Sequence, residues 1–192
     1  MKITAQEIKS FPSASAFRDW LAKYHDQTEG IWLRLFKKDS REESLTHAEA
    51  LDEALCYGWI DGQAKGYDER SWLQRFSPRR PSSAWSKRNT QHVERLSMAA
   101  GRMTPAGLKH VEAAKADGRW RAAYDSPRDA SLPADFLEEL EKNKKAKAFF
   151  ATLNKTNIYA ISYRLQTAKR PETKERRLKI ILRMLTRGEK FH

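Results

Sequence analysis

At positions 57–62 the chain reads Tyr57-Gly58-Trp59-Ile60-Asp61-Gly62, and this stretch decides how the N-terminal part folds. Its first glycine ends a helical pattern, and residues 59–65 and 71–76 then read as two strands joined across 66–70. Pro78 and Pro81 force the next passage to be extended, because each fixes its own φ and disfavours helix in the preceding residue. The sequence therefore predicts a β-hairpin followed by an extended segment.

Helix and strand signals surround this hairpin. Residues 11–25 carry apolar side chains at helical spacing, 31–36 suit a strand, and Thr46 with Glu49 matches a capping box. The second helix has a predicted buried side of Ala48, Leu51, Ala54, Leu55 and Cys56. Ser82 or Ser83 can cap a helix running to about residue 99, with an inner side of Val93, Leu96 and Ala100. Thr104-Pro105 restarts a helix through Leu108, Val111 and Ala114.

An irregular segment, residues 119–133, reads as a linker, and helical patterns follow at 143–153, 157–168 and 173–188. The predicted fold class is α+β: a small N-terminal antiparallel sheet packed with helices, followed by an all-helical basic module. The predicted domains are residues 1–125 and 126–192.

The positive charge is concentrated at one end of the chain. The net charge is +12, yet residues 1–140 hold 22 Lys and Arg against 21 Asp and Glu, whereas residues 141–192 hold 15 against 4. A regional excess of this kind is a footprint for an anionic partner.

The composition is typical of a soluble protein, with 40% hydrophobic and 32% charged residues. No apolar run is long enough to span a membrane, and residues 1–7 lack the apolar stretch of a signal peptide. The single cysteine suits a reducing compartment, so we expect a cytoplasmic location.

No catalytic or metal-binding constellation stands out. His47 and Cys56 are nine residues apart on one predicted helix, on opposite faces, so Cys56 reads as a core residue. Asp52 and Glu53 are expected to face helix and solvent rather than to form an acid pair. Asp61 reads either as a buried acid or, the favoured interpretation, as a turn residue bonded to local amides. We predict no catalytic residues, metal or cofactor.

Trp and Arg are common anchors of binding sites, and both gather after residue 58. Free amides at a helix start, reinforced by guanidinium groups, can hold an anion. Alternatively, these arginines pair with the acids of residues 39–69, where 9 Asp and Glu face 2 Lys and Arg. The predicted ligand-binding residues are Trp59, Asp61, Arg79, Arg80, Trp85, Ser86, Arg88 and Asn89.

The last helix has a predicted basic face. It is either a solvated surface or a surface for an acidic protein, nucleic acid or anionic lipid. Tyr159 and Tyr163, four residues apart, could stack bases or form the edge of the core. The predicted partner-binding residues are Lys169, Arg170, Lys174, Arg176, Arg177, Lys179 and Arg183.

Several motifs resemble a known family. They are EALCYGWIDG at 53–62, FSPRRPSSAWSKRN at 76–89, Gly101-Arg102-Met103 and Gly118-Arg119-Trp120. With Leu132-Pro133-Ala134-Asp135-Phe136, AKRPET at 168–173 and Arg176-Arg177-Leu178, most of the chain resembles the YdeI/OmpD-associated family and its bacteriocin-protection module.

The resemblance implies association with a porin and protection against bacteriocins or cationic antimicrobial peptides, with no enzymatic reaction or cofactor to transfer. A chain this basic would repel cationic peptides, which favours an indirect role through an anionic ligand or protein partner. The leading hypothesis is thus a non-enzymatic cytoplasmic binding protein of the stress-protection type. The alternatives are a nucleic-acid binder acting through the C-terminal helices and an enzyme on an anionic small molecule.

Overall fold

A computed structural model describes residues 7–99, 101–168 and 170–191. Contacts divide these residues into two compact units. The N-terminal unit comprises the described residues up to Ser83 together with 89–117, and the C-terminal unit comprises 84–88 and the described residues from Gly118 on. The domain boundary after residue 125 stays a prediction, while contacts group 84–88 and 118–125 with the C-terminal helices.

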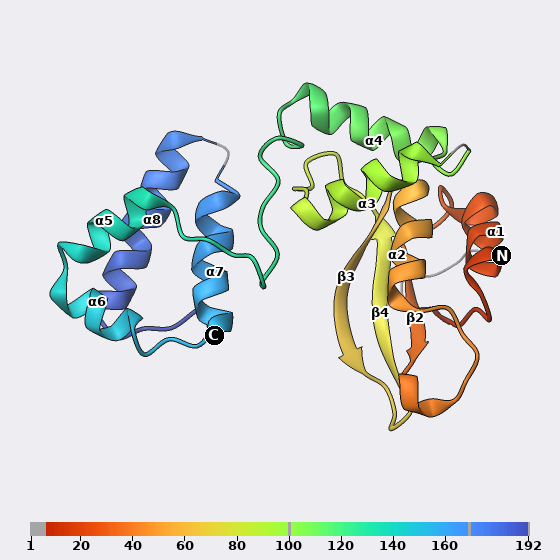
Figure 1. The fold of residues 1–192 in the computed structure, drawn as a ribbon, viewed down its shortest axis with the longest axis horizontal. Helices are drawn as coiled ribbons and strands as arrows, with labels where there is room; N and C mark the ends of the chain where they lie inside the picture. Colours follow the sequence, from red (N-terminus) through yellow and green to blue (C-terminus); the bar gives the residue numbers. More distant parts are fainter. Residues whose placement is uncertain (1–6, 100, 169, 192) are drawn as a thin grey trace. The chain divides into compact units, whose positions relative to one another are not determined.

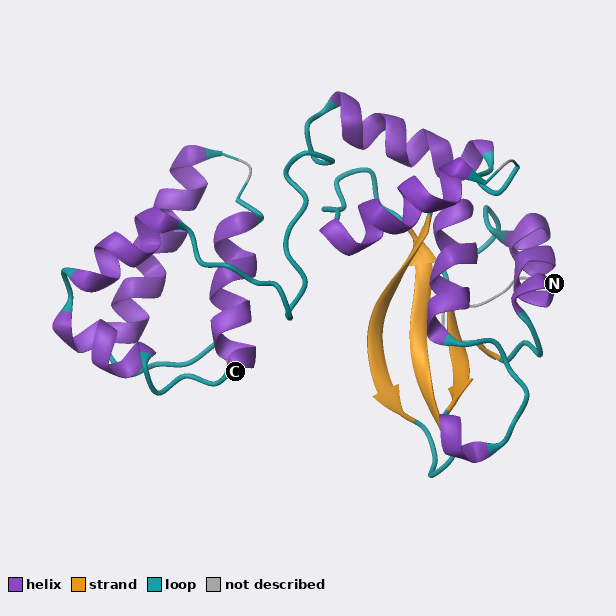
Figure 2. Cartoon of the chain, in the orientation of Figure 1, coloured by secondary structure: helices purple, strands orange, loops and turns teal. Residues whose placement is uncertain are grey.

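The N-terminal unit contains the predicted sheet (Figure 2). It has four strands in the order β1-β2-β4-β3. These are β1 (Ile8–Lys9), β2 (Ile31–Phe36), β3 (Trp59–Gly66) and β4 (Ser71–Pro78). The predicted hairpin is confirmed, since β4 pairs antiparallel with both β3 and β2. The short β1 adds a parallel pair at the edge beside β2, in a segment whose sequence carries no strand pattern.

Helices α1 (Ala14–Tyr24) and α2 (His47–Cys56) pack on one face of this sheet (Figure 1). Alternate residues of β2 are buried beneath them with Trp59 and Phe76, and Phe17 of α1 packs into the same core. The capping box of Thr46 and Glu49 is confirmed at the start of α2. Gly58 follows the end of α2 with a φ of +73°, a conformation that favours glycine. A 3₁₀ turn, η1 (Lys38–Ser40), lies between β2 and α2.

Two further helices follow β4 in the chain, α3 (Lys87–Met98) and α4 (Pro105–Ala116). The predicted start of α3 at Ser82 or Ser83 is wrong: these serines lie in a turn, and the helix begins at Lys87. Thr104 caps α4 as predicted.

The predicted buried faces of the helices are mostly right. Val93, Leu96, Val111 and Ala114 are buried, while Leu108 is exposed. Ala48 is also exposed, because it lies with Glu49 on the outward side of α2, and Ala100 lies outside the described residues.

The described residues of the C-terminal unit form helices α5 (Ala134–Glu141), α6 (Lys144–Phe150), α7 (Lys155–Gln166) and α8 (Pro171–Thr186). Their inward faces enclose one core of Phe136, Leu140, Ala146, Leu153, Ile161, Leu165, Ile181 and Leu185. The predicted all-helical module is thereby confirmed. Within the described ranges, no helix is both long and apolar enough to cross a membrane.

Candidate functional site

The predicted ligand-binding residues are divided between the two units. Trp59, Asp61, Arg79, Arg80 and Asn89 belong to the N-terminal unit. Trp85, Ser86 and Arg88 belong to the C-terminal unit. The PRRP motif and residues 85–88 of the WSKRN motif lie close in sequence but belong to different units, and ligand binding by any of these residues stays a prediction.

Three of the predicted residues are buried in the N-terminal unit. Trp59 has no exposed surface, and its Nε1 donates a hydrogen bond to the carbonyl of His25 at 3.0 Å. Arg79 is 4% exposed and Asn89 is 7% exposed. Trp59 therefore anchors the end of α1 against the sheet, which is a structural role.

Asp61 lies in strand β3, so the turn interpretation is wrong. Its Oδ2 lies 3.2 Å from Nε2 of His47, the first residue of α2. Both side chains are partly exposed, and the His47 ring packs against Trp72 and Phe76. The pair joins the start of α2 to the sheet.

Arg80 is exposed and shares a groove of about 560 Å³ with Arg75, Glu29 and three smaller residues. Arg75 donates to the carbonyls of Glu29 at 3.0 Å and Phe76 at 3.3 Å, which fixes its guanidinium. Burial lowers the pKa of Arg75, and the Glu29 carboxylate opposes this. The cations facing this groove are thus Arg75 and Arg80, and Arg75 had no signal in the motif pattern.

Residues 85–88 of the WSKRN motif are held within the C-terminal unit. Trp85 is 1% exposed and packs against Trp120 with ring centroids 4.9 Å apart. Ser86 forms an isolated β-bridge with Tyr124, and Lys87 Nζ lies 2.6 Å from Asp125 Oδ1. The irregular segment that reads as a linker therefore contains buried contacts.

Asp125 is the most strongly perturbed carboxyl of this unit. Burial alone would raise its pKa, but hydrogen bonds from Lys87, Gln166 and Ser131 outweigh burial and lower the pKa to about 2. Gln166 Nε2 lies 2.8 Å from Asp125 Oδ2, and Ser131 Oγ lies 3.0 Å from it. The carboxylate thus ties the segment before α5 to the end of α7.

This geometry predicts acid sensitivity. Because the folded pKa of about 2 lies below the ordinary value of 3.8, ionised Asp125 stabilises the fold above that value, and the contribution disappears as pH falls toward 2. Its size is about 2 kcal/mol. We expect Asp125→Asn to lower the unfolding free energy at pH 7 and to match the unmodified chain near pH 2, measured by urea unfolding. An exposed control, Asp129→Asn, should leave the pH profile unchanged; equal loss in both variants would contradict this role.

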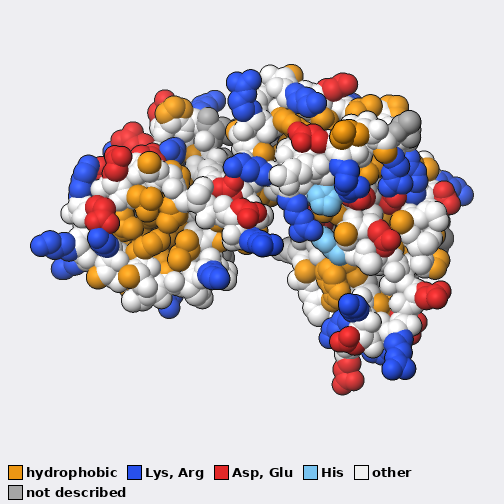
Figure 3. All heavy atoms as spheres, viewed as in Figure 1, with side chains coloured by type: hydrophobic (Ala, Val, Ile, Leu, Met, Phe, Trp, Pro, Cys, Tyr) orange, Lys and Arg blue, Asp and Glu red, His pale blue; other side chains and the backbone are white. Residues whose placement is uncertain are grey.

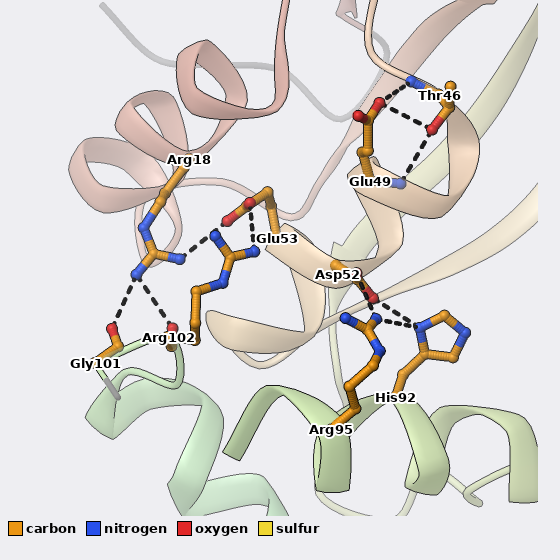
Figure 4. Close-up of polar contacts among 9 residues, drawn as sticks. All are labelled: Arg18, Thr46, Glu49, Asp52, Glu53, His92, Arg95, Gly101 and Arg102. Atoms are coloured by element: carbon orange, nitrogen blue, oxygen red, sulfur yellow. Dashed lines mark hydrogen bonds and ion pairs between the residues drawn. The ribbon is translucent and has the colours of Figure 1, made fainter. Parts of the chain in front are cut away.

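Glu53 is a buried acid, contrary to the predicted solvent-facing position. Its side chain is 3% exposed and accepts hydrogen bonds from Arg18 at 3.0 Å and Arg102 at 2.8 Å (Figure 4). Arg18 also donates to the carbonyls of Gly101 and Arg102. Burial lowers the pKa of Arg18, but its hydrogen bond and charge interaction with Glu53 raise it overall. Glu53 thereby joins α2 to α1 and to the loop before α4.

Asp52, the neighbour of Glu53, makes a second bridge from α2. Its side chain is 17% exposed, lies 2.7 Å from Nδ1 of His92, and also pairs with Arg95 (Figure 4). Both partners come from α3. Acids of residues 39–69 form ion pairs with Arg18, Arg34, Arg70, Arg95 and Arg102.

Cys56 is confirmed as a buried core residue. Burial raises the pKa of its thiol, and the nearby Glu53 charge adds to the increase. The thiol is therefore protonated at neutral pH and is not an activated nucleophile. In the described part of the chain, no cluster of His, Cys, Asp and Glu is arranged to hold a metal ion.

The basic face of α8 is partly neutralised within the C-terminal unit. Lys174 pairs with Asp135 and Lys179 with Glu175, each at 2.6 Å, and Arg177 donates to the carbonyl of Arg164. Lys169 lies outside the described residues.

Other cations of this face stay available. Arg170, Arg176 and Arg183 are exposed, and none has an acidic partner among the residues described. Arg176 and Arg183 are seven residues apart, two helical turns, so they share one face of α8. Lys179 and Ile180 lie between them, and Ile180 is 45% exposed.

These residues border a shallow groove. It measures about 460 Å³, and its remaining lining residues are Glu172 and Glu175. We call Arg176, Lys179, Ile180 and Arg183 the α8 stripe. Acidic and basic side chains both border an apolar area of this unit in the view of Figure 3.

Two family models match different parts of the chain. Residues 9–110, more than half of the 192 residues, match the family model of a domain of unknown function, DUF8412. The chain belongs to the DUF8412 family. Residues 129–188 match the model described as Bacteriocin-protection, YdeI or OmpD-Associated, which supports the predicted family for this part of the chain. The motifs at 53–62, 76–89 and 101–103, which were predicted to belong to the same family, lie instead in the DUF8412 match. Searches of curated proteins and of solved structures each found no match.

The two matches divide the features above between them. The Glu53 and Asp52 bridges lie in the DUF8412 region, and the α8 stripe lies in the YdeI/OmpD-associated module. This module match supports a function of the bacteriocin-protection type.

The Glu53 and Asp52 bridges could not be predicted from sequence because their partners come from distant segments. Arg18 is 35 residues and Arg102 is 49 residues from Glu53. The local signal for Glu53 was its position among Ala50, Ala54 and Leu55 on the buried side of α2.

Proposed function

We propose that the protein is a non-enzymatic, cytoplasmic binding protein of the bacteriocin-protection type, and that its α8 stripe binds an acidic protein partner. The supporting observation is the stripe itself, which lies in the YdeI/OmpD-associated module and combines unneutralised arginines with an exposed isoleucine. Arginine is among the side chains that contribute most to protein interfaces, and the centre of an interface is more apolar than its rim.

The charge distribution supports an acidic partner. Residues 141–192, most of which lie in the module, carry the excess charge of the chain, with 15 Lys and Arg against 4 Asp and Glu. A cationic peptide would be repelled by this surface, whereas an acidic protein would be attracted and oriented by it. Protection is therefore indirect in this proposal, through the acidic partner.

The apolar residue of the stripe favours protein over nucleic acid. Phosphate contacts need only cations, so a nucleic-acid surface gains little from Ile180 between Arg176 and Arg183. Glu172 and Glu175 lie beside the cations of the stripe. An apolar centre that is rimmed by charges of both signs suits a protein interface.

Site-specific photocrosslinking tests the proposal. A photoreactive residue replaces Ile180 in the full chain expressed in bacterial cells, and a second chain carries it at Leu137 on α5 as the control. The two positions are matched, since Ile180 is 45% exposed and Leu137 is 42% exposed. We expect a discrete protein adduct from position 180 that is absent from position 137 and is lost with Arg176→Glu.

Each other outcome counts against the proposal. A nucleic-acid adduct at position 180, with affinity that falls steeply with salt, would support the nucleic-acid alternative instead. Equal adducts from both positions, or adducts unaffected by Arg176→Glu, would show that the α8 stripe does not select a partner.

A further inference from the structure

A second groove of the C-terminal unit lies on a different face from the α8 stripe. One face of α7 contributes to it, because its residues recur at spacings of three and four, and α8 adds an arginine. Its main lining residues are Thr156, Tyr159, Tyr163, Arg164, Thr167 and Arg177. Its volume is about 510 Å³. That size falls within the range of about 300–1,000 Å³ seen for small-molecule sites.

Two tyrosines form an aromatic wall. The rings of Tyr159 and Tyr163 lie 6.1 Å apart, and Tyr124 packs edge-on against Tyr163 at 4.8 Å with an interplanar angle of 86°. Tyr163 is nonetheless 39% exposed, because the side of α7 that faces the core carries Ile161 and Leu165. The neighbouring rings therefore hold Tyr163 in place while part of its surface stays open.

An arginine is fixed at the edge of this wall. Arg177 Nη1 donates to the carbonyl of Arg164 at 2.6 Å and lies 3.3 Å from Thr167 Oγ1. These contacts use one nitrogen of the guanidinium, so its other N–H groups can bind an acceptor in the groove. An arginine held in this way loses little conformational entropy when an anion binds.

This groove differs in charge from the Arg75 groove and from the groove of the α8 stripe. Glu29 lines the Arg75 groove, and Glu172 and Glu175 line the stripe groove. No acidic side chain lines the groove between α7 and α8 in the described structure, while Arg164 and Arg177 both do. The guanidinium of Arg164 stacks on the ring of Phe191 at 4.5 Å. The electrostatic potential here therefore favours an anion.

We propose that this groove binds a small planar aromatic anion, with its ring against Tyr159 and Tyr163 and its carboxylate or phosphate on Arg177. Aromatic rings attract one another in offset or edge-on arrangements, and arginine binds both carboxylate and phosphate through paired N–H groups. Burial raises the pKa of Tyr159, with the charges of Tyr163 and Asp125 adding to it, so its phenol can also donate a hydrogen bond.

Titration of the full chain with naphthoate tests this site. Amide NMR spectra should show saturable shifts confined to α7 and α8. Two matched probes isolate the ligand chemistry: cyclohexanecarboxylate lacks the aromatic ring, and naphthylmethylammonium reverses the charge. We expect each to bind about tenfold more weakly than naphthoate, because stacking and charge-assisted hydrogen bonds each contribute at least that factor.

Variants locate the site. Arg177→Gln and Tyr163→Leu should each weaken naphthoate binding about tenfold. Arg183→Gln removes a cation from the stripe face of the same helix and should have no effect. Ala160→Trp fills the groove and keeps Arg164, Thr167 and Arg177, the residues that form the Arg177 hydrogen bonds, so it tests the site even where Arg177→Gln disturbs folding.

Three results would overturn the proposal. These are an absence of saturable naphthoate binding, equal binding of cyclohexanecarboxylate, and an equal loss of binding in Arg183→Gln and Arg177→Gln. Naphthyl phosphate in the same titration shows whether the site prefers phosphate or carboxylate, and either preference is compatible with the site.

Discussion

Glu53→Ala is expected to destabilise the N-terminal unit by about 3 kcal/mol, because it removes the acid between two arginines at a buried position. Arg18 and Arg102 would lose their carboxylate, and the space of the 3% exposed side chain would become a cavity. Urea unfolding, followed by the fluorescence of Trp59 and its neighbours, measures the change.

Two comparisons separate this network from ordinary surface effects. Glu49→Ala removes an exposed acid from the same helix and should cost only about 1 kcal/mol, the value of its capping box. Arg18→Met with Arg102→Met and Glu53→Leu should recover most of the lost stability, since an apolar triad of similar volume can replace a buried ion cluster. If Glu53→Ala cost no more than Glu49→Ala, the structural importance of the buried network would be refuted.

Gly107→Ala is expected to have a comparable effect of about 3 kcal/mol. A Cβ at position 107 would lie 2.3 Å from the carbonyl oxygen of Cys56 and 2.8 Å from that of Leu55. These atoms belong to the backbone at the end of α2 and cannot rotate away. The same junction holds the hydrogen bond from Thr104 Oγ1 to the Cys56 carbonyl at 2.6 Å, so α4 would have to move from α2.

Gly66→Ala is the matched control, because a Cβ at that position would meet no atom within 4 Å. Thermal melting of both variants should show a clear decrease in the midpoint for Gly107→Ala alone. An unchanged midpoint for Gly107→Ala would mean that α4 and α2 do not pack as closely as the structure indicates.

The elements that could be predicted from sequence are those with local signals. The capping box at Thr46, the cap at Thr104 and the strand pattern of 31–36 depend on residues within one turn or one strand, and all three are confirmed. The helices of the C-terminal unit follow from apolar spacing for the same reason. The burial of Trp59 was not predicted: the sequence placed it among the ligand-binding residues, whereas its ring lies in the core.

The features that could not be predicted depend on contacts between distant segments. Glu53 sits among alanines and leucines, and nothing nearby indicates that Arg18 and Arg102 will meet it. Trp85 follows Pro81 closely, yet its ring packs against Trp120 in the C-terminal unit. The α8 stripe was partly predictable from charge, but which cations are neutralised depended on Asp135, which lies on α5.

The central claim, that the α8 stripe of the YdeI/OmpD-associated module acts in bacteriocin protection, is tested most directly by a survival assay. Cells of a bacteriocin-sensitive strain express the unmodified chain, the stripe variant Arg176→Glu with Arg183→Glu, or the control Lys144→Glu with Lys145→Glu on α6, at equal protein levels. The control makes the same change in net charge within the same module. The proposal predicts that the unmodified and control chains raise the inhibitory bacteriocin concentration and that the stripe variant does not; equal protection by the stripe variant would contradict it.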